Sequence, residues 1–379
     1  MKFDLSEKQA MMKKLFREFA INEVEPIAAD VDEEERFPEE TVKKMAEIGM
    51  MGIPFESKYG GSDGDTLSYV IAVEELSKAC GTTGVILSAH TSLACNPIYT
   101  YGTEEQKQKY LIPLTRGEKL GAFGLTEPNA GTDAATQQTV AVPEGDFYRI
   151  NGTKIFITNG GYADTYVIFA MTDKSKGNRG ISCFILESDM EGFSIGKTEH
   201  KLGIKGSSTT ELIFKDIMVP KENLLGPIGK GFRIAMETLD GGRIGIAAQA
   251  LGIAQGSLDQ AIKYVKERKQ FGKPLSAFQN TQFTIADLQT KIDAARLLVY
   301  RAAYMKDKKY NFATEAAMAK LFASEVAMEV TTKSIQLHGG YGYTRDYPVE
   351  RMFRDAKITE IYEGTSEVQK MVIASSVLR

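Results

Sequence analysis

Four loops rich in glycine, threonine and serine hold most of the residues whose types suit ligand binding. They read GLTEPNAGTD (124–133), IFITNGG (155–161), LHGGYGY (337–343) and IYEGTSE (361–367). Glycine and threonine expose backbone N–H and hydroxyl donors, which suit an anionic group such as a pyrophosphate. Each loop also has a plain structural interpretation: a polar surface loop, a strand end, a helix C-cap, and a carboxylate at a helix N-terminus.

The common nucleotide-binding and acyl-transfer signatures are missing. No GxGxxG follows a strand, no GxxxxGK[ST] occurs, and GPIGKGF (226–232) has the wrong spacing for both. No GxSxG indicates covalent acyl transfer. The three histidines have no partner at i+4, and the three cysteines form no CxxC. We therefore expect no metal site, and a geometry other than these motifs for any dinucleotide.

The bulk properties exclude several classes of protein. The net charge of −4 over 379 residues provides no basic field for nucleic acid or an anionic membrane. Charged residues interrupt every apolar stretch before it reaches membrane-spanning length. The opening MKFDLSEKQ lacks the apolar core of a signal peptide. We expect a cytoplasmic protein with no membrane insertion.

Helical signals dominate the first third of the chain. Ser6 with Gln9, and Thr103 with Gln106, have the spacing of capping boxes at helix N-termini. Between them, the segments 66–80 and 82–101 carry apolar side chains at helical spacing. The pattern predicts an N-terminal helical domain.

Strand signals replace the helical period from about residue 120. Thr139–Val142 and Tyr148–Thr158 flank the turn residues 143–146, as the two strands of a hairpin do. Further β-branched and aromatic runs follow at 165–172, 180–188 and 210–219. No helical period separates these runs, which favours an antiparallel sheet or barrel over a βαβ unit.

The helical period returns in the last part of the chain. Apolar residues at three- and four-residue steps predict long helices over 244–265, 281–307 and 314–337. Ser366 with Gln369 predicts the capping box of a last helix. The chain is therefore predicted to be α+β and mostly helical, with an N-terminal helical domain (1–119), a middle β-domain (120–225) and a C-terminal helical bundle (226–379).

Several segments, taken in order, resemble the acyl-CoA dehydrogenase family. They are GLTEPNAGTD, IFITNG, GGRIGIAAQALG, ERKQFGKPLSAFQ and QLHGGYGYTRDYPVERMFRDAKITEIYEGTSEVQ. The stretch YPVERMFRDAKITEIYEGTSE is the most specific, and the likeness runs over nearly the whole chain. The resemblance implies a middle antiparallel β-barrel, a C-terminal four-helix bundle, bound FAD and assembly as a homotetramer.

The resemblance also implies which residues hold FAD. Phe123 to Thr132 would wrap the isoalloxazine, with Leu125 and Thr126 donating to its pyrimidine edge. Thr158 would lie near flavin N5. Other implied contacts of the same subunit are Gly131, Phe156, Ile157, Thr365 and Glu367. A neighbouring subunit would bring the residues that reach the pyrophosphate and adenosine: Arg268, Phe271, Gln279, Gln336, Leu337, Gly339 and Gly340.

Glu363 matches the catalytic glutamate of the family, the base that removes the substrate's α-proton. Some members carry the acid immediately before the arginine that is here Arg243, but this position is Gly242. Two departures are Phe156, where several relatives have tryptophan, and a threonine at 132 in place of a common serine. The implied acyl-CoA contacts are Thr132, Asp240, Arg243 and Gly364.

The resemblance is closest to short-chain, butyryl-CoA-type members. It implies oxidation of butyryl-CoA to crotonyl-CoA, or the reverse reduction, with an electron-transfer flavoprotein as redox partner. The nearest competing substrates are isovaleryl-CoA and 2-methylbutyryl-CoA. Glutaryl-CoA would need a cation at the end of the acyl slot, and SAHTSLACNPIY (88–99) offers none. An acyl-CoA oxidase and a non-catalytic scaffold on the same fold are the alternatives of another class.

Overall fold

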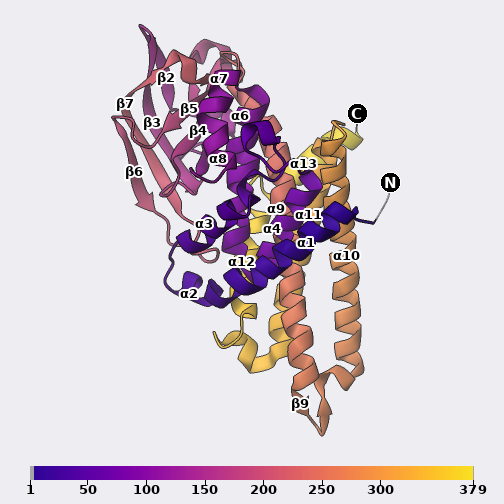
Figure 1. Cartoon of the computed structure of the whole chain (residues 1–379). Helices are drawn as coiled ribbons and strands as arrows, with labels where there is room; N and C mark the ends of the chain where they lie inside the picture. Colours follow the sequence, from indigo (N-terminus) through magenta and orange to yellow (C-terminus); the bar gives the residue numbers. More distant parts are fainter. Residues whose placement is uncertain (1–3, 379) are drawn as a thin grey trace.

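The computed structural model describes residues 4–378 in three regions (Figure 1). Residues 1–3 lie outside the described part. They belong to the opening segment MKFDLSEKQ, from which we predict that the chain has no signal peptide. The N-terminal region contains the helices α1 (Glu7–Phe19), α2 (Ala28–Glu33), α3 (Glu39–Glu47), α4 (Thr66–Ala79), α5 (Gly81–Ser88), α6 (Asn96–Tyr101), α7 (Glu104–Gln106) and α8 (Ile112–Thr115).

Both capping boxes in this region are confirmed. The Gln9 N–H donates to Ser6 Oγ at 3.3 Å, and the Ser6 N–H donates to Gln9 Oε1 at 2.9 Å. The same two bonds join Thr103 and Gln106. The second half of residues 66–101 is not one regular helix, because a π-helical turn (Ala89–Cys95) separates α5 from α6. Such turns are common near functional sites.

The middle region is an eight-stranded sheet. Its strands are β1 (Gly121–Gly124), β2 (Val140–Glu144), β3 (Phe147–Thr158), β4 (Thr165–Met171), β5 (Ile181–Glu187), β6 (Phe193–Thr198), β7 (Thr209–Pro220) and β8 (Leu224–Leu225). Their order is β6-β7-β3-β2-β4-β5-β8, and β1 pairs with β4.

The predicted β2–β3 hairpin is confirmed, and the sheet is mainly antiparallel as expected. It departs from a purely antiparallel barrel in two ways. Both β1 and β2 run parallel to β4, because the loop 125–139 carries the chain back before β2 begins. The pairing path ends at β6 and β8 and does not close within the described residues. Strand β6 lacked a sequence signal, since its side chains are half-buried or exposed.

The C-terminal region consists of long helices with a small hairpin at one end. The elements are α9 (Gly231–Glu267), β9 (Lys269–Gln270), β10 (Lys273–Pro274), α10 (Gln279–Asp307), α11 (Ala313–His338), α12 (Val349–Lys357) and α13 (Ser366–Val377). The α9 face predicted from apolar spacing is buried throughout: Ile244, Ala247, Leu251, Ala254, Leu258, Ala261 and Val265.

The two helical regions share one hydrophobic core although the sheet separates them in sequence. Helix α4 packs on α9, and a single cluster of buried residues joins Phe16 of α1, Ile71 of α4 and Leu251 of α9. The sheet has its own cluster and lies to one side of this helical body (Figure 1). The helical body and the sheet therefore meet along a seam. The loops 124–133, 155–161 and 361–367 lie near that seam, whereas 337–343 lies at the end of α11 and close to Arg268 at the other end of α9.

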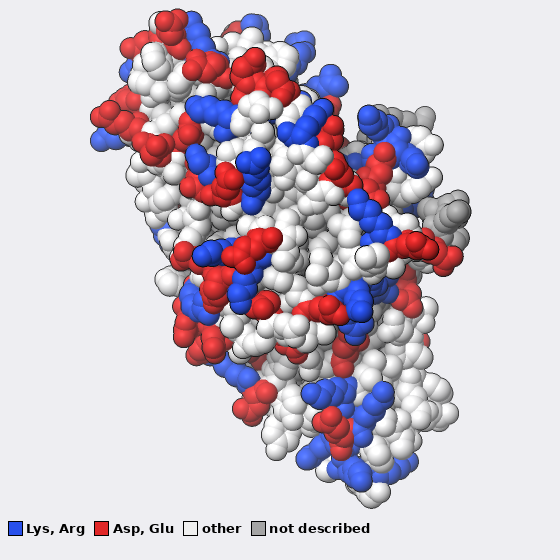
Figure 2. Space-filling model, viewed as in Figure 1, with Lys and Arg blue, Asp and Glu red and all other residues white. Residues whose placement is uncertain are grey.

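Charges of both signs alternate on the face shown in Figure 2. Within residues 4–378, no helix is long and apolar enough to cross a membrane. The same residues contain no group of three His, Cys, Asp or Glu side chains with the geometry of a metal site.

Candidate active site

Glu363 lies in the loop before α13 with an unusual backbone conformation. Its φ is +55°, and Gly364 follows with φ of +88°. A left-handed conformation at a non-glycine residue costs about 1–3 kcal/mol and persists only where surrounding contacts fix it. Hydrogen bonds from the surrounding structure must therefore hold the backbone of Glu363 in this conformation.

Two buried side chains anchor this loop through its carbonyls. Lys320 of α11 donates to the Gly364 carbonyl at 2.7 Å. The Gln369 amide donates to the carbonyls of Gly364 at 2.8 Å and Glu363 at 3.1 Å. The capping box predicted from Ser366 and Gln369 is therefore wrong. The N-cap of α13 is Thr365, and Gln369 reaches back to the loop instead.

The Glu363 carboxylate is held in a desolvated position. Its Oε2 is buried and has no hydrogen-bond partner among the described residues. Burial raises the pKa of Glu363 to about 7, against the opposing attraction of Arg243 and Lys320. Burial likewise lowers the pKa of Lys320 to about 8, although Glu363 partly restores it. The site thus holds a carboxyl group that takes up and releases a proton near neutral pH.

Asp240 and Arg243 form an ion pair on the face of α9 that approaches Glu363. Arg243 Nη1 donates to Asp240 Oδ1 at 2.5 Å. The Arg243 guanidinium is buried, and its Nε has no partner among the described residues. Burial raises the pKa of Asp240, and Arg243 opposes that rise. The unused Nε donor is available to a ligand.

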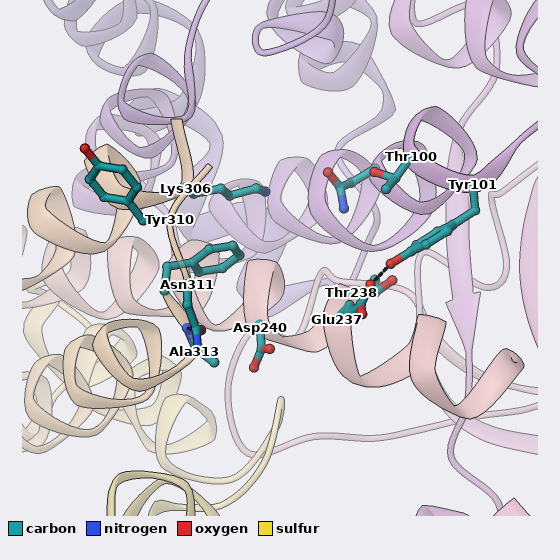
Figure 3. A pocket seen from close by; sticks show the side chains of 11 residues that line it. Thr100, Tyr101, Glu237, Thr238, Asp240, Lys306, Tyr310, Asn311 and Ala313 are labelled. Carbon is teal, nitrogen blue, oxygen red and sulfur yellow. Dashed lines mark hydrogen bonds between the residues drawn. The ribbon is translucent and has the colours of Figure 1, made fainter. Parts of the chain in front are cut away.

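A cavity of about 400 Å³ lies between α6, α9 and the α10–α11 connection (Figure 3). Lys306 reaches into it from α10, and Asp240 contributes from α9. Burial lowers the pKa of Lys306, whose ammonium has no hydrogen-bond or ion-pair partner among the described residues. The remaining lining residues are Asn96, Thr100, Tyr101, Glu237, Thr238, Tyr310, Asn311, Phe312 and Ala313. The cavity therefore mixes cationic, anionic and neutral polar groups.

The loop after β1 and the end of β3 lie side by side. The Ile155 N–H donates to the Thr126 carbonyl at 2.9 Å. A register shift between Lys154 and Ile157 leaves Phe156 with φ of +58° and a side chain that is 59% exposed. A bulge of this kind re-aims a side chain. The Phe156 ring is therefore held at the surface and does not pack in the core.

The structure separates the other predicted residues into two groups. Near the seam lie Phe123, Leu125, Gly131, Thr132, Ile157, Thr158, Gly364, Thr365 and Glu367. The second group lies at the far end of α9, α10 and α11, next to the β9–β10 hairpin (Figure 1): Arg268, Phe271, Gln279, Gln336, Leu337, Gly339 and Gly340. In that group Phe271 is 92% exposed, and the Arg268 guanidinium lies 5.7 Å from the Tyr341 ring centre.

The sequence patterns singled out none of Lys154, Lys306 and Lys320. In the structure Lys154 donates to the Leu125 carbonyl, Lys306 lines the cavity and Lys320 donates to the Gly364 carbonyl. A signal was present, because Lys320 lies in AAMAKLFASEVA among small apolar residues at core spacing. Its side chain is completely buried, as is that of Lys154.

The chain matches three domain families along its length. Residues 6–118 match the acyl-CoA dehydrogenase N-terminal domain, residues 122–217 the middle domain, and residues 229–378 the C-terminal domain. These matches cover most of the chain in the order in which the three structural regions occur.

Characterised relatives match over almost the whole length. A short-chain-specific acyl-CoA dehydrogenase of Clostridium acetobutylicum is 66% identical over 379 residues, covering 100% of both chains. A subunit of the caffeyl-CoA reductase–Etf complex of Acetobacterium woodii is 52% identical, covering 99% of both chains.

Solved structures agree with this fold throughout. Butyryl-CoA dehydrogenase of Megasphaera elsdenii has a TM-score of 0.99 at 54% identity, over 100% of both chains. A chain from a study of the electron transferring flavoprotein of Acidaminococcus fermentans has the same TM-score at 58% identity and full coverage. An acyl-CoA dehydrogenase of Bacillus anthracis in complex with FAD has a TM-score of 0.93 at 35% identity, over 99% of this chain and 67% of that one. The chain belongs to the acyl-CoA dehydrogenase family.

Proposed function

We propose that the chain catalyses FAD-dependent α,β-dehydrogenation of short-chain acyl-CoA thioesters, converting butyryl-CoA to crotonyl-CoA, and that Glu363 removes the α-proton. The observation that carries the proposal is the buried Glu363 carboxylate, which titrates near neutral pH. The names of the Clostridium acetobutylicum and Megasphaera elsdenii relatives support the substrate class. A reductase among the relatives supports operation of the same site in the reverse direction.

The chain supplies both a base and a donor for the proton-transfer half of the reaction. A thioester α-proton is weakly acidic, so a carboxylate works best when its pKa approaches the operating pH. Burial raises the pKa of Glu363 to about 7, which brings it close to a neutral operating pH. The Glu363 N–H has no acceptor among the described residues, and it would donate to the thioester oxygen as negative charge develops there. FAD, when bound, supplies the acceptor for the hydride that leaves the β-carbon.

The seam between sheet and helices fits a flavin ring. The N–H groups of Leu125 and Thr126 have no acceptor among the described residues, so they remain available to the polar edge of the ring. Phe156 offers an exposed aromatic face. A side chain at Gly131 would meet no atom within 4 Å, which leaves open space beside the loop. The donor set and the aromatic face together match an isoalloxazine.

The second group of predicted residues supports FAD binding across a subunit boundary. Arg268 and Gln279 are exposed at the far end of the long helices, away from the sheet of their own chain (Figure 1). Phe271 of the β9–β10 hairpin is 92% exposed, and aromatic side chains of this kind are enriched in protein interfaces. Burial of this hairpin against another copy, most simply in a homotetramer, would place these residues near a neighbour's cofactor. Cofactor loss and dissociation would then be coupled.

The cavity beside Asp240 suits the amide-bearing arm of CoA. The lining carries one ammonium, Lys306, and two carboxylates, Asp240 and Glu237, so it does not favour a doubly charged phosphate. It does offer donors and acceptors in balance, which a pantetheine chain with two neutral amides would satisfy. Asp240 also links the cavity to Arg243 and hence to the base. The CoA arm would therefore run from Glu363 past Asp240 into this cavity.

An electron-transfer flavoprotein is the redox partner that the relatives support. The Acetobacterium woodii relative is a subunit of an Etf complex, and the Acidaminococcus fermentans structure comes from a study of such a flavoprotein. Turnover with that partner, without peroxide formation, is the expected behaviour. Peroxide produced in step with substrate use would instead favour an acyl-CoA oxidase.

A chain-length series tests the proposed substrate class. Steady-state kcat/KM is measured with straight acyl-CoAs of increasing length and with isovaleryl-CoA and 2-methylbutyryl-CoA, using an artificial electron acceptor. The proposal predicts a maximum at the four-carbon thioester. A maximum at a branched substrate would replace butyryl-CoA by that substrate, and no turnover with any thioester would contradict the function.

A further inference from the structure

Lys154 is the most completely buried cation of the sheet, and it lies directly behind the loop proposed to meet the flavin. It belongs to β3, and its side chain has no solvent exposure. Burial lowers its pKa to about 8, while the adjacent Glu127 opposes that fall. A buried ammonium is costly unless it is fully hydrogen-bonded, so the groups that surround Lys154 explain its presence.

The ammonium of Lys154 donates to three acceptors. These are Glu127 Oε1 at 2.7 Å, Gln137 Oε1 at 3.1 Å and the Leu125 carbonyl at 3.1 Å. Two of these acceptors stand at the start of the loop and one stands at its end. Lys154 thus closes the loop 125–137 from behind.

Glu127 extends the same network to the beginning of β2. Its carboxylate accepts from the N–H of Gln138 at 2.5 Å and from that of Thr139 at 3.0 Å. The hydrogen bonds lower the pKa of Glu127 together with the charge of Lys154, against its burial. The pair therefore satisfies its own charges and orders both ends of the loop.

The bond to Leu125 fixes the direction of a peptide group. A trans peptide is planar, and its C=O and N–H point in opposite directions. Because the Leu125 carbonyl points at Lys154, the N–H of Thr126 points away from Lys154, out of the sheet. The Ile155 N–H holds the next carbonyl, that of Thr126, at 2.9 Å. The Thr126 N–H has no acceptor among the described residues, so it is free to donate to a bound ring on the side opposite Lys154.

We propose that Lys154 is a positioning residue that orients and polarises the Leu125–Thr126 peptide, so that Thr126 N–H is a strong donor to the bound flavin and the reduced flavin is favoured. The inference rests on the proposed binding of FAD. A positive charge behind a carbonyl draws electron density through the peptide and strengthens the N–H on its other side. Reduction adds negative charge to the ring, which such a donor stabilises more than the oxidised form.

The rival interpretation is that the pair only stabilises the sheet. The two interpretations differ in the flavin potential, because a purely structural loss weakens both redox states of the cofactor equally. Lys154→Met alone leaves Glu127 as an unpaired buried charge, which is strongly destabilising and endangers folding. The double variant Lys154→Met/Glu127→Gln removes both charges, and its glutamine oxygen still accepts from the loop N–H groups.

The experiment measures the two-electron midpoint potential of the holoenzyme against a reference dye under anaerobic conditions. Its matched control is Tyr110→Phe, which deletes a buried hydroxyl that bonds Asn223 at 3.0 Å and takes no part in the Lys154 network. We expect the double variant to weaken binding of reduced FAD at least tenfold more than binding of oxidised FAD. That ratio lowers the midpoint potential by about 30 mV. The control should keep the wild-type potential.

Two failures are distinguishable in this experiment. If the wild-type protein takes up FAD and the double variant has an unchanged potential, Lys154 has only a structural role and the inference is wrong. If the wild-type protein takes up no FAD under any condition, the proposed function fails, and the inference about the flavin falls with it.

Discussion

The carboxylate of Glu363 occupies the space in which a side chain on Gly242 would begin. A Cβ at residue 242 would lie 2.2 Å from Glu363 Oε2 and 2.8 Å from Leu93 Cδ2. Helix α9 thus presents bare backbone to the base. The two positions at which the sequence resemblance places a catalytic acid share one volume, and in this chain only Glu363 fills it. The absence of a side chain at 242 is therefore part of the site.

Gly242→Ala should displace the base without damaging the fold. The added methyl group would force the carboxylate away by about 1 Å, and a misplacement of that size costs about 10²-fold in rate. Alanine stabilises a helix by about 1 kcal/mol relative to glycine, so the effect of the substitution on the backbone should not lower the melting temperature. Single-turnover flavin reduction, with the flavin content measured in parallel, checks both expectations.

Gly241→Ala is the matched control on the same helix. A Cβ there would meet only Lys306 Nζ, at 3.2 Å, and this is the far end of a flexible side chain. We expect a change in rate of no more than a few-fold. Equal losses in the two variants would mean that α9 tolerates no added methyl group here, and the explanation by base displacement would be wrong.

The raised pKa of Glu363 should appear in the stability of the protein. The folded-state pKa, about 7, lies above the ordinary value of 4.5. Between these values the folded protein keeps a proton that the unfolded chain releases, so stability falls as pH rises through this window and stays low above it. Glu363→Gln cannot ionise. Its unfolding free energy relative to wild type should increase by about 1–3 kcal/mol between pH 5 and pH 8, measured by denaturant titration. Parallel curves for the two proteins would place the titrating group elsewhere.

Lys320→Met should raise the pH at which the enzyme becomes active. The base must be ionised, so kcat/KM rises with pH through the pKa of Glu363. Lys320 lowers this pKa by its charge, and its removal shifts the profile to higher pH. The lost bond to Gly364 costs about 1.5–3 kcal/mol of stability in addition. Lys333→Met, an exposed lysine of the same helix, is the control. If the rate falls but the pH profile of kcat/KM does not shift, Lys320 only holds the loop in place and does not tune the pKa of Glu363.

Lys306→Met tests the route proposed for the CoA arm. Loss of one hydrogen bond from a charged donor costs about 1.5–3 kcal/mol of binding, or about 10–100-fold in KM. The chemistry takes place beyond Asp240, so kcat should hold. Lys308→Met removes an exposed charge nearby and should leave KM unchanged. An unchanged KM in Lys306→Met would remove this cavity from the substrate path.

Local rules predicted most of the fold because local contacts dominate those elements. The Ser6 and Thr103 capping boxes formed both of their bonds, and the apolar spacing on α9 gave its buried face. The same rules failed at Gln369, whose amide donates to the carbonyls of Glu363 and Gly364 and does not cap its own helix. At this residue, the tertiary contacts of the Glu363 loop override the local preference for a capping box.

The buried lysines and the pairing of β1 with β4 show what periodicity misses. A lysine in a strand usually points to water, so only the three-dimensional network identifies Lys154 as an internal group. The parallel pairings of the sheet depend on where the loop 125–139 returns the chain, which no local signal records. The role of Glu363 is implied by family resemblance and stays a prediction, whereas its closeness to Gly242 could be found only from the structure.

An anaerobic absorption spectrum, recorded while butyryl-CoA is added to wild-type protein and to Glu363→Gln, shows whether Glu363 is the base of an acyl-CoA dehydrogenation. We expect the wild-type flavin to bleach with a long-wavelength band. We expect the variant to bind the thioester and keep an oxidised flavin. Equal bleaching in the two proteins would move the base away from Glu363, and a wild-type flavin that ignores butyryl-CoA and every other acyl-CoA would contradict the proposed reaction.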